Sequence, residues 1–127
     1  MDRNSFVEEI YQFICENSLC AGIVKYFGAR GKMQMDFAES VYTSKIEDLE
    51  LSARSFHGLK RAGIDTVEQL LNAVNDGTLS SVRNLGAKSC NEISIKILEF
   101  GYNNFSEKGK KAFIRNLIDI NLIDCGV

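Results

Sequence analysis

The chain has 127 residues, of which 45% are hydrophobic and 25% are charged, and its formal net charge is −2. A chain of this length buries a sizeable core as one ordinary domain, and its composition is that of a globular protein. The weakly acidic charge excludes bulk attraction to nucleic acid, so any such contact has to come from a local cluster of positive groups. No apolar run approaches the roughly 20 residues of a membrane span and no signal peptide is recognisable. We therefore expect a cytoplasmic protein that makes no membrane contact.

The cysteines and the single histidine do not form a pattern that binds metal or performs catalysis. Structural zinc usually needs two close pairs of ligands, and no two cysteines stand as C-x-x-C. His57 has no partner in the sequence that would make it catalytic. We therefore expect no metal, no cofactor and no enzymatic activity. We interpret most of the cysteines as small core or boundary residues; they are Cys15, Cys20, Cys90 and Cys125.

Residues 1–45 combine two capped or amphipathic helical patterns with one ambiguous stretch. Residues 5–8 have the form of a capping box, and the apolar spacing after them predicts a helix to about residue 16. A second short helix is predicted over residues 19–27. From Met33 to Val41 the pattern fits both a strand and a helix. We favour the helix because Ala38 and Glu39 suit it and no partner strand is visible.

The central segment has clear helix starts and ends. Ser52 is placed to cap a helix over residues 53–62, which Gly63 ends in a left-handed conformation. Residues 66–69 form another capping box and open a second short helix. A turn signal over residues 75–77 closes this helix. The spacing predicts two helices joined by a tight turn.

A long helix and a terminal helix complete the sequence. After a short turn near Val82, a bend over residues 84–86 leads into a helix over residues 87–100, which Gly101 is expected to end. A loop to Phe105 then precedes the last helix, whose apolar face carries Phe113, Leu117 and Ile120. We interpret the basic residues around it as a solvated face in preference to a second DNA patch: Lys108, Lys110, Lys111 and Arg115. With roughly six or seven helices and no clear strand, the protein is predicted to be all-α.

The bend before the long helix has the features of a phosphate-binding site. A helix start presents unpaired N–H groups and the positive end of the helix dipole, so it attracts an anion. Gly86 leaves the backbone open to close approach, and Lys88 and Ser89 add two further hydrogen bonds. The segment lacks the earlier glycine of a P-loop and the buried strand before it, so nucleotide hydrolysis is not predicted.

Two motifs in this region resemble the C-terminal domain of the bacterial RNA polymerase alpha subunit. The first is Ile46-Glu47-Asp48-Leu49-Glu50-Leu51-Ser52-Ala53-Arg54-Ser55, followed by Leu59-Lys60. The second is Asn84-Leu85-Gly86-Ala87-Lys88-Ser89 with Glu92-Ile93. The similarity covers roughly residues 46 to 101 and needs one extra residue near Asp76 to Leu79.

The resemblance implies a compact helical fold with helix-hairpin-helix elements that binds the minor groove of A/T-rich DNA and receives contacts from transcription activators. Carried over by position, it makes Arg54 the minor-groove arginine, with Asn84, Gly86, Lys88 and Ser89 forming the phosphate-binding bend. A narrow minor groove has a negative potential that suits an arginine. This sequence has His57 and Gly58 where the family usually has an asparagine and a small polar residue. His57 can still donate a hydrogen bond to DNA.

The sequence therefore predicts a helix-hairpin-helix-containing domain at residues 46–101, a helical extension at residues 1–45, and a terminal helix and tail at residues 102–127. We expect a non-catalytic, transcription-associated module that docks on the backbone and A/T-rich minor groove of double-stranded DNA, with Arg54 beside the bend on one exposed surface. The alternative is a protein-interaction module that contacts RNA polymerase, sigma factor or a transcription regulator. Such a module would bury or neutralise the positive face and expose an apolar patch elsewhere.

Overall fold

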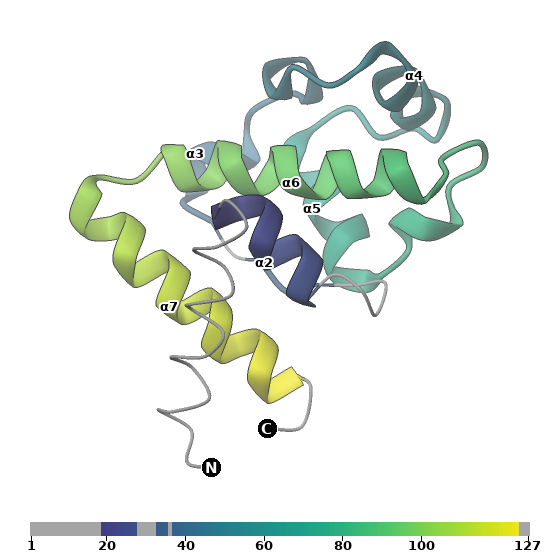
Figure 1. The fold of residues 1–127 in the computed structure, drawn as a ribbon. Coiled ribbons are helices and arrows are strands. Elements are labelled where there is room, and N and C mark those ends of the chain that lie inside the picture. The colour runs from purple at the N-terminus through teal and green to yellow at the C-terminus, as the bar shows by residue number, and fades with distance from the viewer. Residues whose placement is uncertain (1–18, 28–32, 36, 125–127) are drawn as a thin grey trace.

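The computed structural model describes residues 19–27, 33–35 and 37–124, and the first predicted helix, over residues 5–16, lies outside these ranges. Within them the regular elements are all helical (Figure 1), so the prediction of an all-α fold is confirmed. They are α2 (Leu19–Phe27), α3 (Glu39–Tyr42), η2 (Ile46–Leu49), α4 (Ala53–Arg61), α5 (Val67–Asp76), η3 (Leu79–Ser81), α6 (Ala87–Asn103) and α7 (Glu107–Asp124), where η marks a 3₁₀ helix.

α6 runs through the middle of the molecule, and the other helices pack around it. α2 and α4 contact α6 from opposite sides in Figure 1, and α5 also packs against it. The inward side chains of α6 recur at helical spacing, and Ile93, Ile97 and Leu98 are completely buried. One continuous core joins them to fully buried residues of four other helices: Ile23, Leu59, Leu70 and Ile118.

α4 and α5 begin as the sequence predicts. Ser52 caps α4, and its Oγ accepts a hydrogen bond from the Ser55 N–H at 3.3 Å. α5 begins with a capping box in which the Thr66 hydroxyl accepts from the Gln69 N–H while the Gln69 side chain accepts from the Thr66 N–H. Gly63, just after α4, has a φ of 80°, which glycine adopts at little cost.

The prediction of a helix from Met33 is wrong. Residues 33–35 and 37–38 form no helix, and α3 begins only at Glu39. Met33, Met35 and Phe37 are all buried. Alternate side chains therefore enter the core, as they do from one face of a strand.

Two asparagines supply the backbone pairing that a neighbouring strand would otherwise give to this segment. Asn75, near the end of α5, accepts a hydrogen bond from the Met35 N–H at 2.9 Å and donates one to the Met35 carbonyl at 3.0 Å. Asn121 of α7 accepts from the Gln34 N–H at 2.8 Å and donates to the Gln34 carbonyl at 2.9 Å. Each side chain satisfies both backbone groups of one residue, so the segment is fixed between α5 and α7.

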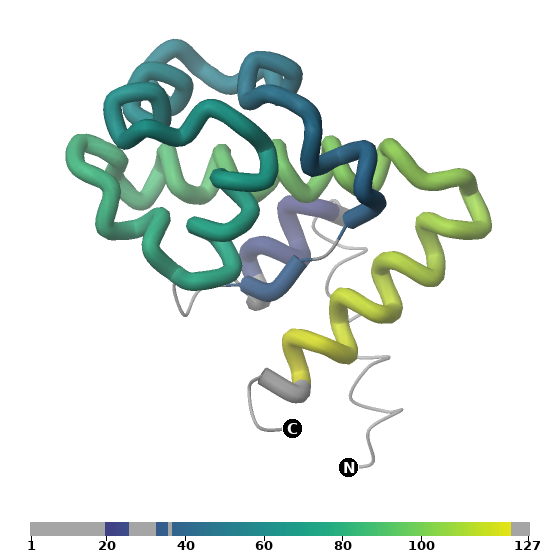
Figure 2. Tube along the Cα trace, turned by 180° about the vertical axis from the view of Figure 1, so that it is seen from behind, coloured from purple at the N-terminus to yellow at the C-terminus, as the bar shows by residue number. Residues whose placement is uncertain are grey.

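Gly101 does not end α6, contrary to the sequence-based expectation. The helix continues to Asn103, and the predicted loop shortens to the three residues before α7. Gly101 is buried, and a Cβ atom built on it would lie 2.2 Å from Cε1 of Phe37. The glycine is therefore required by the packing of Phe37, and the turn into α7 (Figure 2) comes later in the sequence.

α7 buries only part of its predicted apolar face. Phe113 and Leu117 are buried in the core, as expected. Ile120, predicted to lie with them, is 43% exposed. The terminal helix thus keeps an apolar side chain on its outer surface.

Candidate nucleic-acid interface

A tight turn leads from η3 into α6. The Leu85 N–H donates a hydrogen bond to the Val82 carbonyl at 3.2 Å, which places Arg83 and Asn84 at the two corners of a four-residue turn. Asn84 has a φ of 68°, a left-handed conformation that asparagine tolerates better than most residues. Both corner side chains are at least partly exposed.

The start of α6 is open to solvent and has no side-chain cap. Gly86 occupies the N-cap position, and the first helical hydrogen bond runs from the Cys90 N–H to the Gly86 carbonyl at 3.0 Å. Among the described residues, no acceptor is present for the N–H groups of Ala87, Lys88 and Ser89. These three donors are therefore available to an anion.

Neither backbone geometry nor packing requires a glycine at position 86. The φ of Gly86 is −81° and its ψ is 176°, an extended conformation that any residue adopts. No atom lies within 4 Å of a Cβ atom built on Gly86. The described structure therefore does not account for the absence of a side chain at this position.

Close packing holds α4 against this turn. Gly58 is buried, and a Cβ atom built on it would lie 2.6 Å from Cδ2 of Leu85. The glycine lets α4 approach the residue between Asn84 and Gly86. The sequence showed Gly58 only as the replacement of a small polar residue that the family usually has at this position. No local pattern predicted its packing role.

Glu92 ties the start of α4 to the second turn of α6. Its Oε1 accepts hydrogen bonds from the Ser52 N–H at 3.2 Å and the Ser52 hydroxyl at 3.0 Å. Burial alone would raise the pKa of Glu92, but hydrogen bonds from Ser55 and Ser52 outweigh it and lower the pKa below its usual range. The ionised carboxylate thus fixes the first turn of α4, where Arg54 lies, next to α6.

The structure brings together the elements that carry the predicted site residues. α4 lies over the N-terminal half of α6 (Figure 1), and Arg54 is exposed on its first turn. His57 lies one turn later and meets Phe56 edge-on, with the ring centroids 5.4 Å apart. On the α6 side the predicted residues are exposed or, for Ser89, half-buried: Asn84, Gly86, Lys88 and Ser89.

The basic side chains near the turn have no acidic partner among the described residues. Arg54, Arg83 and Lys88 make no ion pair with the described residues. Lys60, at the other end of α4, pairs with Glu47 at 3.3 Å and with an aspartate at 3.0 Å. The positive charge beside the turn is therefore not neutralised. Arg83 was not predicted as a site residue. The signal that could have found it is its position directly before the predicted bend at Asn84.

The described residues contain no group of three His, Cys, Asp or Glu side chains that could hold a metal ion. Two cysteines among them are free thiols. Burial, with a smaller contribution from Glu99, raises the pKa of Cys20 to about 12, and burial also raises the pKa of Cys90. Thiols that hold their protons so firmly are poor nucleophiles and poor metal ligands. None of the helices described is long and apolar enough to span a bilayer.

The described structure is an all-helical domain with an open helix start beside basic residues that make no ion pair with the described residues, an arrangement that suits an anionic partner. The protein belongs to the family of the C-terminal domain of the bacterial RNA polymerase alpha subunit, whose family model matches residues 34–99, just over half of the sequence. It is thus a transcription-associated module. The matched range includes the two motifs that carry the resemblance and begins within the extended segment fixed by Asn75 and Asn121.

Three curated relatives are DNA-directed RNA polymerase alpha subunits. The protein is 51% identical over 57 residues to the DNA-directed RNA polymerase subunit alpha of Rubrobacter xylanophilus, an alignment that spans 45% of this sequence and 18% of the relative. It is 47% identical over 66 residues to that of Bacillus velezensis and 46% identical to that of Oceanobacillus iheyensis, spanning 52% of this sequence and 21% of each relative. The similarity thus extends over about a fifth of the length of these subunits. No solved structure matched the protein.

Proposed function

We propose that this protein is a non-catalytic module that docks on double-stranded DNA in bacterial transcription and acts in the cytoplasm. The observation that carries the proposal is the bare Gly86 at the uncapped start of α6, which neither backbone geometry nor packing requires. A phosphate can approach this backbone closely, and the N–H groups of the first turn and the Lys88 and Ser89 side chains bind it.

Arg54 supplies the second half of the proposed interface. Since Leu85 packs on Gly58 and Glu92 holds Ser52, α4 is fixed against the phosphate-binding turn. An arginine on the first turn of α4 can then enter the minor groove while the turn holds the flanking backbone. A/T-rich DNA is preferred because its minor groove is narrow and strongly negative. His57, one turn further, adds a hydrogen-bond donor to the same surface.

A second function is contact with RNA polymerase or a regulator. The specific observation in its favour is an apolar hollow beside α7, on a helix that lies beyond the matched residues. The positive surface near the turn is nevertheless exposed and not neutralised, which favours DNA as its partner. The two functions use different surfaces, so one molecule can perform both.

Fluorescence anisotropy with A/T-rich and G/C-rich duplexes at low salt tests the DNA function. Arg54→Ala should remove most of the preference for A/T-rich DNA, at a cost of about 1–3 kcal/mol in binding free energy. Lys88→Ala should weaken binding to both duplexes alike, because phosphates carry no sequence information. Arg61→Ala, at the far end of α4, is the matched control and should bind as the wild type does. Failure of the wild type to bind either duplex would overturn the proposal.

A further inference from the structure

His57 is the single histidine of the sequence, and it lies on a helix that is proposed to meet DNA. It is exposed on α4 three residues after Arg54, so the two side chains lie on the same side of the helix. Its ring meets the Phe56 ring edge-on, with the centroids 5.4 Å apart. An aromatic neighbour therefore restrains the imidazole while leaving it exposed.

Basic side chains surround His57 on its own helix. Arg54, Lys60 and Arg61 all lie one helical turn away from it. His57 makes no ion pair with the described residues. A protonated ring therefore adds to the positive charge of α4, and no described carboxylate neutralises it.

The charged groups on the elements next to α4 do not pair with His57. Glu92 of α6 accepts hydrogen bonds from Ser52. Glu47 of η2 and Asp65, just before α5, both pair with Lys60. The other charged side chains of η2, of the residues that join it to α4, and of the turn and first helical turn of α6 are Asp48, Glu50, Arg83 and Lys88. None of them forms an ion pair with the histidine.

The charge of this surface depends on pH through His57. Histidine is the side chain that gains a proton as the pH falls from about 8 to 5, whereas ordinary carboxylates stay ionised and lysines and arginines stay protonated. Burial would raise the pKa of Glu92, but hydrogen bonds from Ser55 and Ser52 lower it below its usual range. Burial raises the pKa of the Cys90 thiol. Both groups therefore keep one charge state where histidine changes its own.

We propose that His57 binds a DNA phosphate in its protonated form, so that the affinity for DNA rises as the pH falls. The inference rests on the proposed function, in which Arg54 enters the minor groove; His57, one turn further along the same side of α4, contacts the adjoining backbone. A protonated ring offers two N–H donors and a charge, whereas the neutral ring offers one donor and no charge. Because the phosphate favours the protonated ring, binding takes up a proton.

Anisotropy titrations with the A/T-rich duplex at low salt, between about pH 5.5 and 8, test the inference. Wild-type affinity should rise about five- to tenfold towards the acid end, since the charged hydrogen bond is stronger than the neutral one. His57→Asn keeps a donor without a charge and should bind at every pH as the wild type does at the alkaline end. His57→Lys is charged throughout and should bind at every pH as the wild type does in acid.

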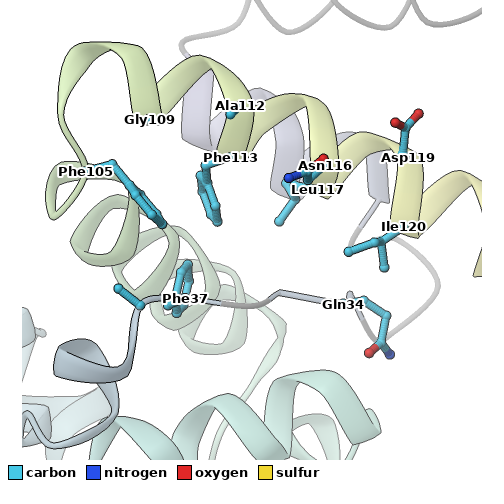
Figure 3. Close-up of a pocket in the computed structure, with 11 residues that line it drawn as sticks. Gln34, Phe37, Phe105, Gly109, Ala112, Phe113, Asn116, Leu117, Asp119 and Ile120 are labelled. Atoms are coloured by element: carbon cyan, nitrogen blue, oxygen red, sulfur yellow. The ribbon is translucent and has the colours of Figure 1, made fainter.

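A matched control separates a local contact from a change in net charge. Ile120 is exposed on α7 and stands at one end of an apolar hollow that no histidine lines (Figure 3). Ile120→Lys adds a positive charge outside the DNA interface and should leave both the affinity and its pH dependence unchanged. Urea unfolding at both ends of the pH range verifies that each variant is folded.

The salt dependence of binding gives a second readout. In acid, the slope of log K against log salt concentration should be steeper by about 0.9 in the wild type than in His57→Asn, and at the alkaline end the two slopes should agree. Binding that does not vary with pH, or that varies equally in the wild type and His57→Asn, would refute the inference while leaving DNA docking in place. No binding to either duplex at any pH would overturn the proposed function, and this inference with it.

Discussion

Glycine has two different functions at three positions around α6. Gly58 and Gly101 are buried at close contacts, with Leu85 and with Phe37 respectively. Gly86 is exposed with open space around it. The first two are requirements of packing, whereas we attribute the third to the proposed phosphate, which would approach the backbone there.

Gly101→Ala should destabilise the protein by about 1–3 kcal/mol or more, because the new methyl group would overlap the ring of Phe37 and force the core to move. Urea unfolding measures the free energy. Gly86→Ala is the matched control, and its effect on stability should stay below about 1 kcal/mol. Equal stability losses in the two variants would contradict the packing role of Gly101.

Gly86→Ala should instead weaken DNA binding, because its methyl group occupies the space through which a phosphate reaches the α6 backbone. We expect the affinity for A/T-rich and G/C-rich duplexes to fall by similar factors, measured by anisotropy, while the thermal midpoint changes little. Full affinity in Gly86→Ala would remove the main support for the phosphate site.

Glu92 should make stability depend on pH. Its pKa is lowered in the folded protein, whereas an unfolded glutamate has a pKa of about 4.3, so ionised Glu92 stabilises the fold above that pH. This contribution is lost as the pH falls through the folded-state pKa. Glu92→Gln should therefore cost about 1 kcal/mol at neutral pH, and the difference from wild type should shrink in acid. Urea unfolding across a pH series measures both, and a difference that does not vary with pH would argue against the ionised carboxylate.

At the scale of elements, the extended segment around Met35 joins helices that are distant in sequence. Asn75 and Asn121 pair with consecutive residues of this segment from α5 and α7. The Asn121 amide also donates to the Leu117 carbonyl at 2.8 Å, so its position is fixed from its own helix. α7 is therefore attached to the matched part of the protein by specific hydrogen bonds as well as by apolar packing.

Asn121→Ala should destabilise the protein by about 1–3 kcal/mol, because the backbone N–H and carbonyl of Gln34 would lose their partner in a partly buried place. Asn116→Ala removes an exposed asparagine from the same helix and should have little effect. Chemical denaturation compares the two, and equal losses would mean that the backbone pairing adds no stability.

Local signals predicted the elements whose ends are set by neighbouring residues. The caps at Ser52 and Thr66 and the left-handed Gly63 depend on side chains within a few positions, so their patterns were sufficient. The segment from Met33 was predicted wrongly because its partners, Asn75 and Asn121, are distant in sequence. The prediction for Gly101 was wrong for the same reason, because the ring that requires this glycine belongs to Phe37.

The candidate site was predictable in its residues but not in its assembly. The helix start with Gly86 and Lys88 was recognisable from spacing, and Arg54 came from the family resemblance. Two contacts that hold α4 in place join residues 27 and 40 positions apart, Gly58 with Leu85 and Ser52 with Glu92, and no local pattern indicates them. Arg83 became a candidate only when the turn placed it beside the start of α6.

At the scale of the whole molecule, a net charge of −2 has to be reconciled with the proposed polyanionic partner. Long-range attraction is weak, so affinity depends on the few unpaired basic residues near the turn. Each phosphate contact made by a basic residue contributes a slope of about −0.9 to the dependence of log K on log salt concentration. With Arg54, Arg83 and Lys88 in place, the slope should be about −3.

Arg83→Ala should reduce this slope by about one contact and lower the affinity for both duplexes alike, because a turn-corner arginine beside the start of α6 meets phosphate and reads no base edge. Anisotropy titrations over a series of salt concentrations give the slope for wild type and variant. Arg61→Ala removes the same charge from the distant end of α4, so it controls for the change in net charge. If Arg61→Ala and Arg83→Ala lower the slope equally, overall charge governs binding and the local interface is wrong. If only Arg83→Ala lowers it, an acidic molecule binds DNA through a single localised cluster.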